Sequence, residues 1–331
     1  MRLPTRLTSL RVAMKKHGVD AYLVPSNDPH QSEYVADHWK TRVWLTGFTG
    51  SAGIAIITQQ FAGVWTDSRY FLQAEEELKN SKFKLQKQVV PHAPEHMQWL
   101  ADNLPVGAKV GCDGALFSVN QVRSLAKALG KDMELDTSVD LIPEVWKNRP
   151  ALPQEKVFKH ALKYAGKSRV EKLTSIRTAM QHNAADFYLI TTLSDIAWTF
   201  NLRGNDVEFN PVVISYAMIG QEIAYLFIDQ QKLNDALVEE LRGEGIFIKD
   251  YASIATLLRK IPTGKNILVH QPSISIKLFN EIKPEQIIKG ENIVAPRKAI
   301  KNATEIGHLR EVMKKDGVAL LRLYRWLEKE V

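Results

Sequence analysis

The chain has 331 residues, 45% of them hydrophobic and 24% charged, which is enough for two or three globular domains. Its net charge of +7 is scattered among acidic residues, so the clustered basic face of a nucleic-acid-binding protein is not expected. The apolar runs fall far short of the ~20 residues that span a bilayer, and residues 1–7 do not begin a signal peptide. A single cysteine, Cys112, allows no intrachain disulfide. We therefore expect a cytoplasmic protein with no nucleic-acid or membrane partner.

The first predicted elements are an amphipathic helix, with Leu7, Leu10 and Met14 at helical spacing, and a buried strand at 21–24. A turn-rich loop follows. Within residues 28–38 of this loop, five side chains are able to bind metals: Asp28, His30, Glu33, Asp37 and His38. Clusters of this kind in loops are typically solvated or in contact with substrate, and a metal site is the less favoured alternative.

A glycine-rich segment at 47–53 precedes a β-branched run at 54–58. Phosphate-binding loops instead open a helix, and the glycine spacing matches neither the Walker nor the dinucleotide pattern. Ser51 is not in a G-x-S-x-G nucleophile elbow, because position 49 is threonine. We predict a tight turn that leads into an antiparallel hairpin with strands near 54–58 and 63–66.

Residues 92–96 read His-Ala-Pro-Glu-His, which matches the zinc-peptidase pattern H-x-x-E-H. Zinc binding needs both histidines on one helical face and a third ligand. Proline at position 94 is tolerated only in the first helical turn, which leaves His92 outside the helix. We therefore predict a loop that leads into a helix. Cys112 ends a predicted strand at 109–112 and is expected to be a small core residue rather than a nucleophile.

Three prolines within 143–153 indicate a linker, and the sequence after it repeats the first part. With a shift of 166 positions, residues 10–24 and 176–190 are identical at six of fifteen positions. Further along, each half has a predicted strand that ends in an aspartate, Asp67 or Asp229, followed by the start of a helix. This duplication predicts two tandem α/β domains, at 1–150 and 157–297, each with a mixed β-sheet flanked by helices.

The segment 298–331 predicts one long amphipathic helix. Asn302 is its expected N-cap and Glu305 its capping-box partner. Large apolar residues then recur at helical spacing: Ile306, Leu309, Met313, Leu320, Tyr324 and Leu327. Burial of each is worth ~1.5–3 kcal/mol, so the stripe requires a partner. A missing third domain is the favoured explanation, and packing on the second domain or dimerisation are the alternatives.

Seven segments, in order along the chain, resemble the cytosolic three-domain Xaa-Pro aminopeptidases of the creatinase/prolidase group. They are residues 25–34, 45–53, 65–71, 146–150, 194–204, 209–212 and 298–306. Ser68 stands where the family usually has glycine. The resemblance implies two creatinase-like N-terminal domains, with 298–331 as the first helix of a truncated pita-bread peptidase domain.

In that family the third domain binds two divalent metals, usually manganese, through two aspartates, a histidine and two glutamates. Stretches resembling the family's D-G-T-T-D and G-T-G-H-G motifs do not occur in residues 1–331. The resemblance therefore implies a chain with no catalytic residues, metal ligands or cofactor of its own. Because metal coordination brings the pKa of the attacking water near neutrality, we expect this chain to be inactive alone.

The family's enzymes release the N-terminal residue from peptides with proline at position two. The resemblance implies that this part restricts access to the active site and supports a homodimer. The candidate substrate-binding residues are charged side chains on loops: His30, Glu33, Arg42, Asp67 and Arg69. Attachment of the loops to the domain surface is the alternative role for them. A second hypothesis is a metal-free interaction module whose C-terminal helix binds the partner.

Overall fold

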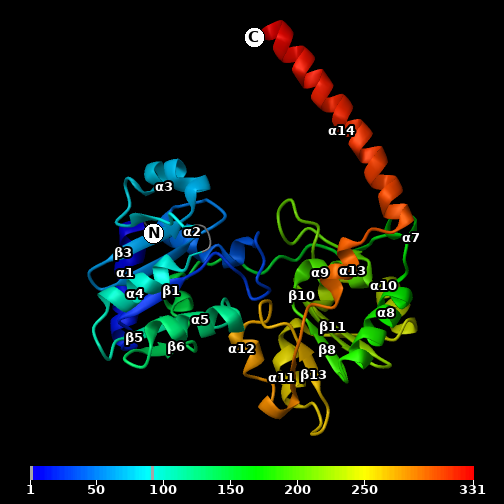
Figure 1. Ribbon diagram of the computed structural model, residues 1–331, viewed down its shortest axis with the longest axis horizontal. Helices are drawn as coiled ribbons and strands as arrows, with labels where there is room; N and C mark the ends of the chain where they lie inside the picture. The colour runs from blue at the N-terminus through cyan, green and yellow to red at the C-terminus, as the bar shows by residue number, and fades with distance from the viewer. Residues whose placement is uncertain (1–2, 91–92) are drawn as a thin grey trace.

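The computed structural model describes residues 3–90 and 93–331 and shows two α/β domains followed by a long helix (Figure 1). Each domain contains a six-stranded mixed sheet, in the order β4-β3-β2-β1-β5-β6 in the first and β12-β11-β10-β8-β13-β14 in the second. Both sheets pair their third and fourth strands antiparallel and their fourth and fifth parallel. The predicted pair of mixed sheets with flanking helices is confirmed.

The strands of the first domain are β1 (Ala21–Val24), β2 (Ile54–Thr58), β3 (Ala62–Thr66), β4 (Lys84–Lys87), β5 (Lys109–Cys112) and β6 (Glu134–Asp136). Its helices are α1 (Leu3–Lys16), α2 (Thr41–Thr46), α3 (Phe71–Leu78), α4 (Glu95–Asn103), α5 (Val119–Leu129) and α6 (Ile142–Val145), with 3₁₀ turns η1 (Asp37–Trp39) and η2 (Ser68–Tyr70). β2 and β3 form the predicted antiparallel hairpin, and Cys112 is buried as expected. Between Val145 and Phe158 the chain has no helix or strand, which agrees with the linker inferred from its prolines.

The strands of the second domain are β8 (Phe187–Ile190), β10 (Ser215–Gly220), β11 (Ala224–Ile228), β12 (Ile246–Lys249), β13 (Ile267–Val269) and β14 (Ile287–Lys289), beside a ribbon of β7 (Phe158–Lys159) and β9 (Leu202–Arg203). Its helices are α7 (Leu162–Ala165), α8 (Arg169–His182), α9 (Leu193–Phe200), α10 (Asp235–Gly243), α11 (Ile254–Arg259), α12 (Ile276–Phe279) and α13 (Val294–Ala299), with 3₁₀ turns η3 (Gln230–Lys232), η4 (Tyr251–Ser253) and η5 (Pro284–Gln286). The two aspartates at equivalent positions of the repeat have the same role. Asp67 caps η2 and Asp229 caps η3, each through its side chain.

The two domains meet through equivalent parts of the repeat. Ser118 caps α5 and Ser275 caps α12, and these helices follow the equivalent strands β5 and β13. The Val119 amide donates to the Ile274 carbonyl at 3.1 Å, and the Ile276 amide donates to the Phe117 carbonyl at 2.9 Å. The reciprocal pattern is that of an isologous contact within one chain. A single hydrophobic cluster also contains buried residues of both domains, including Leu23, Trp39, Val207 and Ile214.

The long C-terminal helix α14 (Ala303–Glu330) extends away from both domains (Figure 1). The predicted capping box is confirmed: Asn302 and Glu305 exchange side-chain to backbone hydrogen bonds. The first turns touch α7, where His308 Nε2 lies 2.9 Å from the Lys163 carbonyl. None of the residues of α14 is buried, so the apolar stripe does not pack on the second domain. Among the helices of the described residues, none combines the length and apolar character that a membrane crossing requires.

Candidate functional site

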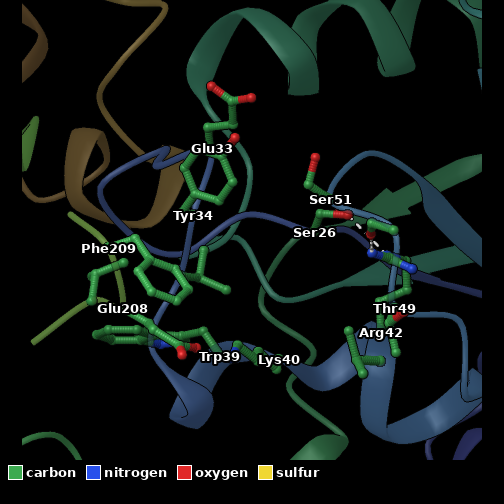
Figure 2. A pocket seen from close by; sticks show the side chains of 14 residues that line it. Ser26, Glu33, Tyr34, Trp39, Lys40, Arg42, Thr49, Ser51, Glu208 and Phe209 are labelled. Carbon is green, nitrogen blue, oxygen red and sulfur yellow. Dashed lines mark hydrogen bonds between the residues drawn. The ribbon is translucent and has the colours of Figure 1, made fainter. Parts of the chain in front are cut away.

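A cavity of about 330 Å³ lies where the two domains face each other (Figure 2). Its walls come from the loop after β1, from α2 and the glycine-rich turn of the first domain, and from residues 207–209 of the second. Of the five substrate-binding candidates, Glu33 and Arg42 line it. The cavity also takes in residues that sequence reasoning did not select as site residues: Tyr34, Lys40, Glu208 and Phe209.

Arg42, on α2, is only 2% exposed and holds the glycine-rich turn in place. Its guanidinium donates to Ser26 Oγ at 2.8 Å, to the Phe48 carbonyl at 2.9 Å, and to the Gly50 carbonyl. It also lies over the Phe48 ring, 4.7 Å from the centroid. Because these partners are neutral, burial lowers the pKa of Arg42 to about 10. Gly50 is required in the turn, since a Cβ there would lie 2.4 Å from the Phe48 ring.

The rim of the cavity carries two exposed aromatic side chains, Tyr34 at 55% and Phe209 at 98% exposure. Phe209 has a φ of +59°, which is a left-handed conformation that bulky residues rarely adopt. Asp206 fixes the start of its loop: the side chain is buried and accepts from Lys232 Nζ at 2.6 Å and from the Ile214 amide at 2.7 Å. The surrounding structure therefore imposes the strained, exposed position of Phe209.

His30 does not lie on an open loop. Its side chain is 0% exposed and so is that of Asp28, in contrast to the solvated or substrate-facing cluster that the sequence suggested. His30 Nδ1 lies 2.8 Å from the Thr191 carbonyl, which can only accept, so Nδ1 carries the proton. Nε2 then accepts from the Tyr251 hydroxyl at 3.0 Å, and the ring packs 4.3 Å from that of Tyr216. Thus both ring nitrogens of His30, a residue of the first domain, contact groups of the second.

Asp67 and Arg69 pair with each other on the surface. Arg69 Nη2 lies 2.8 Å from Asp67 Oδ2, and the Arg69 backbone amide donates to the same carboxylate. Neither residue lines the cavity. A substrate contact for the five candidates stays a prediction, and the geometry favours Glu33 and Arg42. A signal for Phe209 was present in the sequence, because the Phe-Asn-Pro stretch is a turn that begins with a large aromatic residue.

No group of three histidine, cysteine, aspartate or glutamate side chains that could hold a metal comes together within residues 3–90 and 93–331. In the His-Ala-Pro-Glu-His stretch, His92 lies outside the described residues. His96 lies in the first turn of α4, where burial lowers its pKa to about 4. Asp28 Oδ1 accepts from the His30 backbone amide, the His30 ring contacts the Tyr251 hydroxyl, and Asp37 pairs with Lys40. These residues do not fit a two-metal centre.

Comparison with known families and structures agrees with this architecture. Models of the creatinase/prolidase N-terminal domain match residues 6–149 and again 148–305, so the class is that of tandem creatinase-type domains. A Xaa-Pro aminopeptidase 1 of Dictyostelium discoideum is 37% identical over 98% of this chain and 53% of its own length. A probable Xaa-Pro aminopeptidase P of Aspergillus clavatus is 39% identical, with 98% and 51% covered.

Among solved structures, the X-prolyl aminopeptidase of Caenorhabditis elegans, described as a cytosolic enzyme with a di-nuclear active site, superposes with a TM-score of 0.91 at 28% identity. The superposition covers 100% of this chain and 56% of that one. The chain belongs to the creatinase/prolidase N-terminal domain family, and it is similar to Xaa-Pro aminopeptidases, as its sequence motifs suggested. It spans about half the length of the relatives that it matches.

Proposed function

We propose that this chain is the non-catalytic N-terminal part of a Xaa-Pro aminopeptidase, an enzyme that releases the N-terminal residue from peptides with proline second. The observation that carries the proposal is the match along 98% of the chain to aminopeptidases about twice as long. Two divalent metals, expected to be manganese, would then be bound by a catalytic part outside residues 1–331. This part of the enzyme would bind and orient the peptide and exclude unsuitable substrates. The hydrolytic chemistry would belong to the catalytic part.

The cavity between the domains supports a role in substrate access. Glu33 and Arg42 present opposite charges in a space large enough for one or two amino-acid residues of a peptide. The continuous core and the reciprocal bridge between α5 and α12 fix the two domains relative to each other, so they form a rigid wall. We further propose that the enzyme is cytoplasmic and a homodimer, and that the wall limits entry to short, unstructured peptides.

Changing Glu33 to glutamine in the longer enzyme that contains this chain is expected to raise KM for peptides of five or more residues. One charge-assisted hydrogen bond is worth ~1.5–3 kcal/mol, so the rise should be roughly tenfold or more. The value of kcat should change little, because Glu33 is not a group that touches the scissile bond. Steady-state kinetics on Xaa-Pro peptides of increasing length measures both.

Glu76→Gln is the matched control. Glu76 is an exposed carboxylate on α3 that pairs with Lys79 and does not line the cavity. If the Glu33 variant and this control gave the same KM for every peptide length, Glu33 would have no contact with substrate.

The second candidate function is a metal-free interaction module, and the exposed stripe of α14 favours it. Large side chains along this helix are open to solvent, among them Leu309 at 48%, Met313 at 63% and Trp326 at 55%. Such a face is typical of helices that bind a partner. The reading frame after the codon for Val331 separates the two functions: metal-binding motifs downstream support the peptidase, and a stop codon supports the module.

A further inference from the structure

One end of the cavity is formed by the buried cation Arg42, and the carboxylate of Glu77 lies close enough to act on its charge. Arg42 is almost fully buried, and its guanidinium donates to one hydroxyl and two carbonyls. Within the described residues, none of the carboxylates lies within ion-pair distance of its guanidinium. Arginine has five N–H groups, so Nη1 and Nη2 each keep one that is available. Buried cations are normally paired with an anion, and Arg42 lines the cavity.

Three hydroxyl side chains and a second cation lie at the same end. Ser26, Thr49 and Ser51 lie around Arg42 (Figure 2), and Ser51 Oγ is 2.7 Å from the Tyr70 hydroxyl. Lys40, also on the wall, is 39% exposed and is held by Asp37 at 2.6 Å. A carboxylate placed here would meet two cations, while the hydroxyls of Ser26 and Thr49 already donate to the Gly53 carbonyl and to Glu77. Guanidinium groups recognise carboxylates with favourable geometry because their N–H donors match the two oxygens.

The opposite end of the cavity is aromatic. Tyr34, Trp39 and Phe209 lie together there, away from Arg42 (Figure 2). Phe209 leaves almost its whole ring in solvent, while the buried Asp206–Lys232 pair keeps its loop in place. An apolar side chain of a ligand would cover this surface at little cost in conformational entropy, since the loop is already ordered.

We propose that the cavity binds the carboxyl-terminal residue of a short peptide. The carboxylate lies at Arg42 and Lys40, and an apolar side chain packs on Tyr34 and Phe209. This inference rests on the proposed function, because it takes the ligand to be the peptide substrate. Glu33 and Glu208 at the rim disfavour an acidic residue next to the end of the peptide. The site thus selects peptides whose free end reaches it, and it would favour short substrates with an apolar last residue.

The test uses the purified 331-residue chain and calorimetric titration with two probes, Ala-Pro-Ala-Ala-Phe as the free acid and as its C-terminal amide. Only the ligand changes, so the folding of the protein is not in question. The free acid is expected to bind at least roughly tenfold tighter than the amide, as loss of a charge-assisted contact to a buried cation implies. Equal affinities, or no binding of either probe, would overturn the inference.

Two variants locate the site. Phe209→Ala removes an exposed ring and should weaken both probes by a similar, several-fold factor, which leaves the ratio of acid to amide unchanged. Lys40→Gln should weaken the acid alone. Lys79→Gln, at an exposed lysine outside the cavity, is the control for charge. If Phe209→Ala bound both probes as tightly as the parent chain does, the peptide would bind outside this cavity. Failure of this titration can be told apart from failure of the proposed function. Glu33→Gln could still raise KM for peptides even if the cavity did not bind their carboxyl end.

Discussion

Replacement of Lys232 by methionine is expected to lower the free energy of unfolding by about 3–5 kcal/mol. The side chains of Lys232 and Asp206 are 3% and 0% exposed, and their charged atoms lie 2.6 Å apart. Without the ammonium group, Asp206 would remain as a buried carboxylate that still accepts from the Ile214 amide but has no cation beside it. Its loop carries Glu208 and Phe209, so the same variant should also loosen the rim of the cavity.

Urea denaturation of the variant and the parent chain measures this loss. Lys314→Met is the matched control, because Lys314 pairs with Glu311 on the surface of α14, with side chains 71% and 65% exposed. Exposed pairs of this kind contribute about 0–1 kcal/mol. A loss from Lys232→Met no larger than that of the control would show that the buried pair does not hold the loop.

Replacement of His30 by alanine is expected to cost about 2–4 kcal/mol, since a buried polar group left without its partner costs ~1–3 kcal/mol. The Thr191 carbonyl and the Tyr251 hydroxyl would both lose their contact with the histidine. Because these groups belong to the second domain, the variant should also weaken the attachment of the two domains. Limited proteolysis near the linker, together with urea denaturation, measures both effects.

His30 should also make the stability of the fold depend on pH. Burial lowers the pKa of His30 below 6.5, and the neighbouring Asp28 opposes this only partly. The unfolded chain therefore takes up a proton near pH 6.5 while the folded chain does not, so stability falls as the pH drops below that value. Tyr216 and Tyr251, which face the ring, stay neutral throughout this range because burial raises their pKa values.

Between pH 7.5 and 5.5 the parent chain should therefore lose more stability than His30→Ala, in which this contribution is absent. His182→Ala is the control, as His182 lies exposed at the end of α8. If the parent, His30→Ala and His182→Ala lost stability equally over this range, the buried imidazole would have no part in the pH dependence.

Local sequence signals predicted the elements that depend on neighbouring residues. The repeat placed two similar sheets, the β-branched run after the glycines predicted the β2–β3 hairpin, and Asn302 with Glu305 marked the start of α14. These features follow from spacing, turn chemistry and capping, which a single sequence displays directly.

The sequence did not reveal the contacts of the site, because they join distant segments. His30 binds Thr191 and Tyr251, which are 161 and 221 positions away, so nothing near His30 shows that the second domain covers it. Arg42 is bound by neutral carbonyls that carry no signal in the residue types. The exposed ring of Phe209 depends on a backbone conformation that its own side chain disfavours.

The most direct test of the proposal is an assay of the purified 331-residue chain with manganese and Xaa-Pro peptides. Because the metal-binding motifs of the family are absent from its sequence, we expect no release of the N-terminal residue above that of a mock purification. Release that is abolished by a chelator, and that co-purifies with this chain through successive columns, would contradict the account.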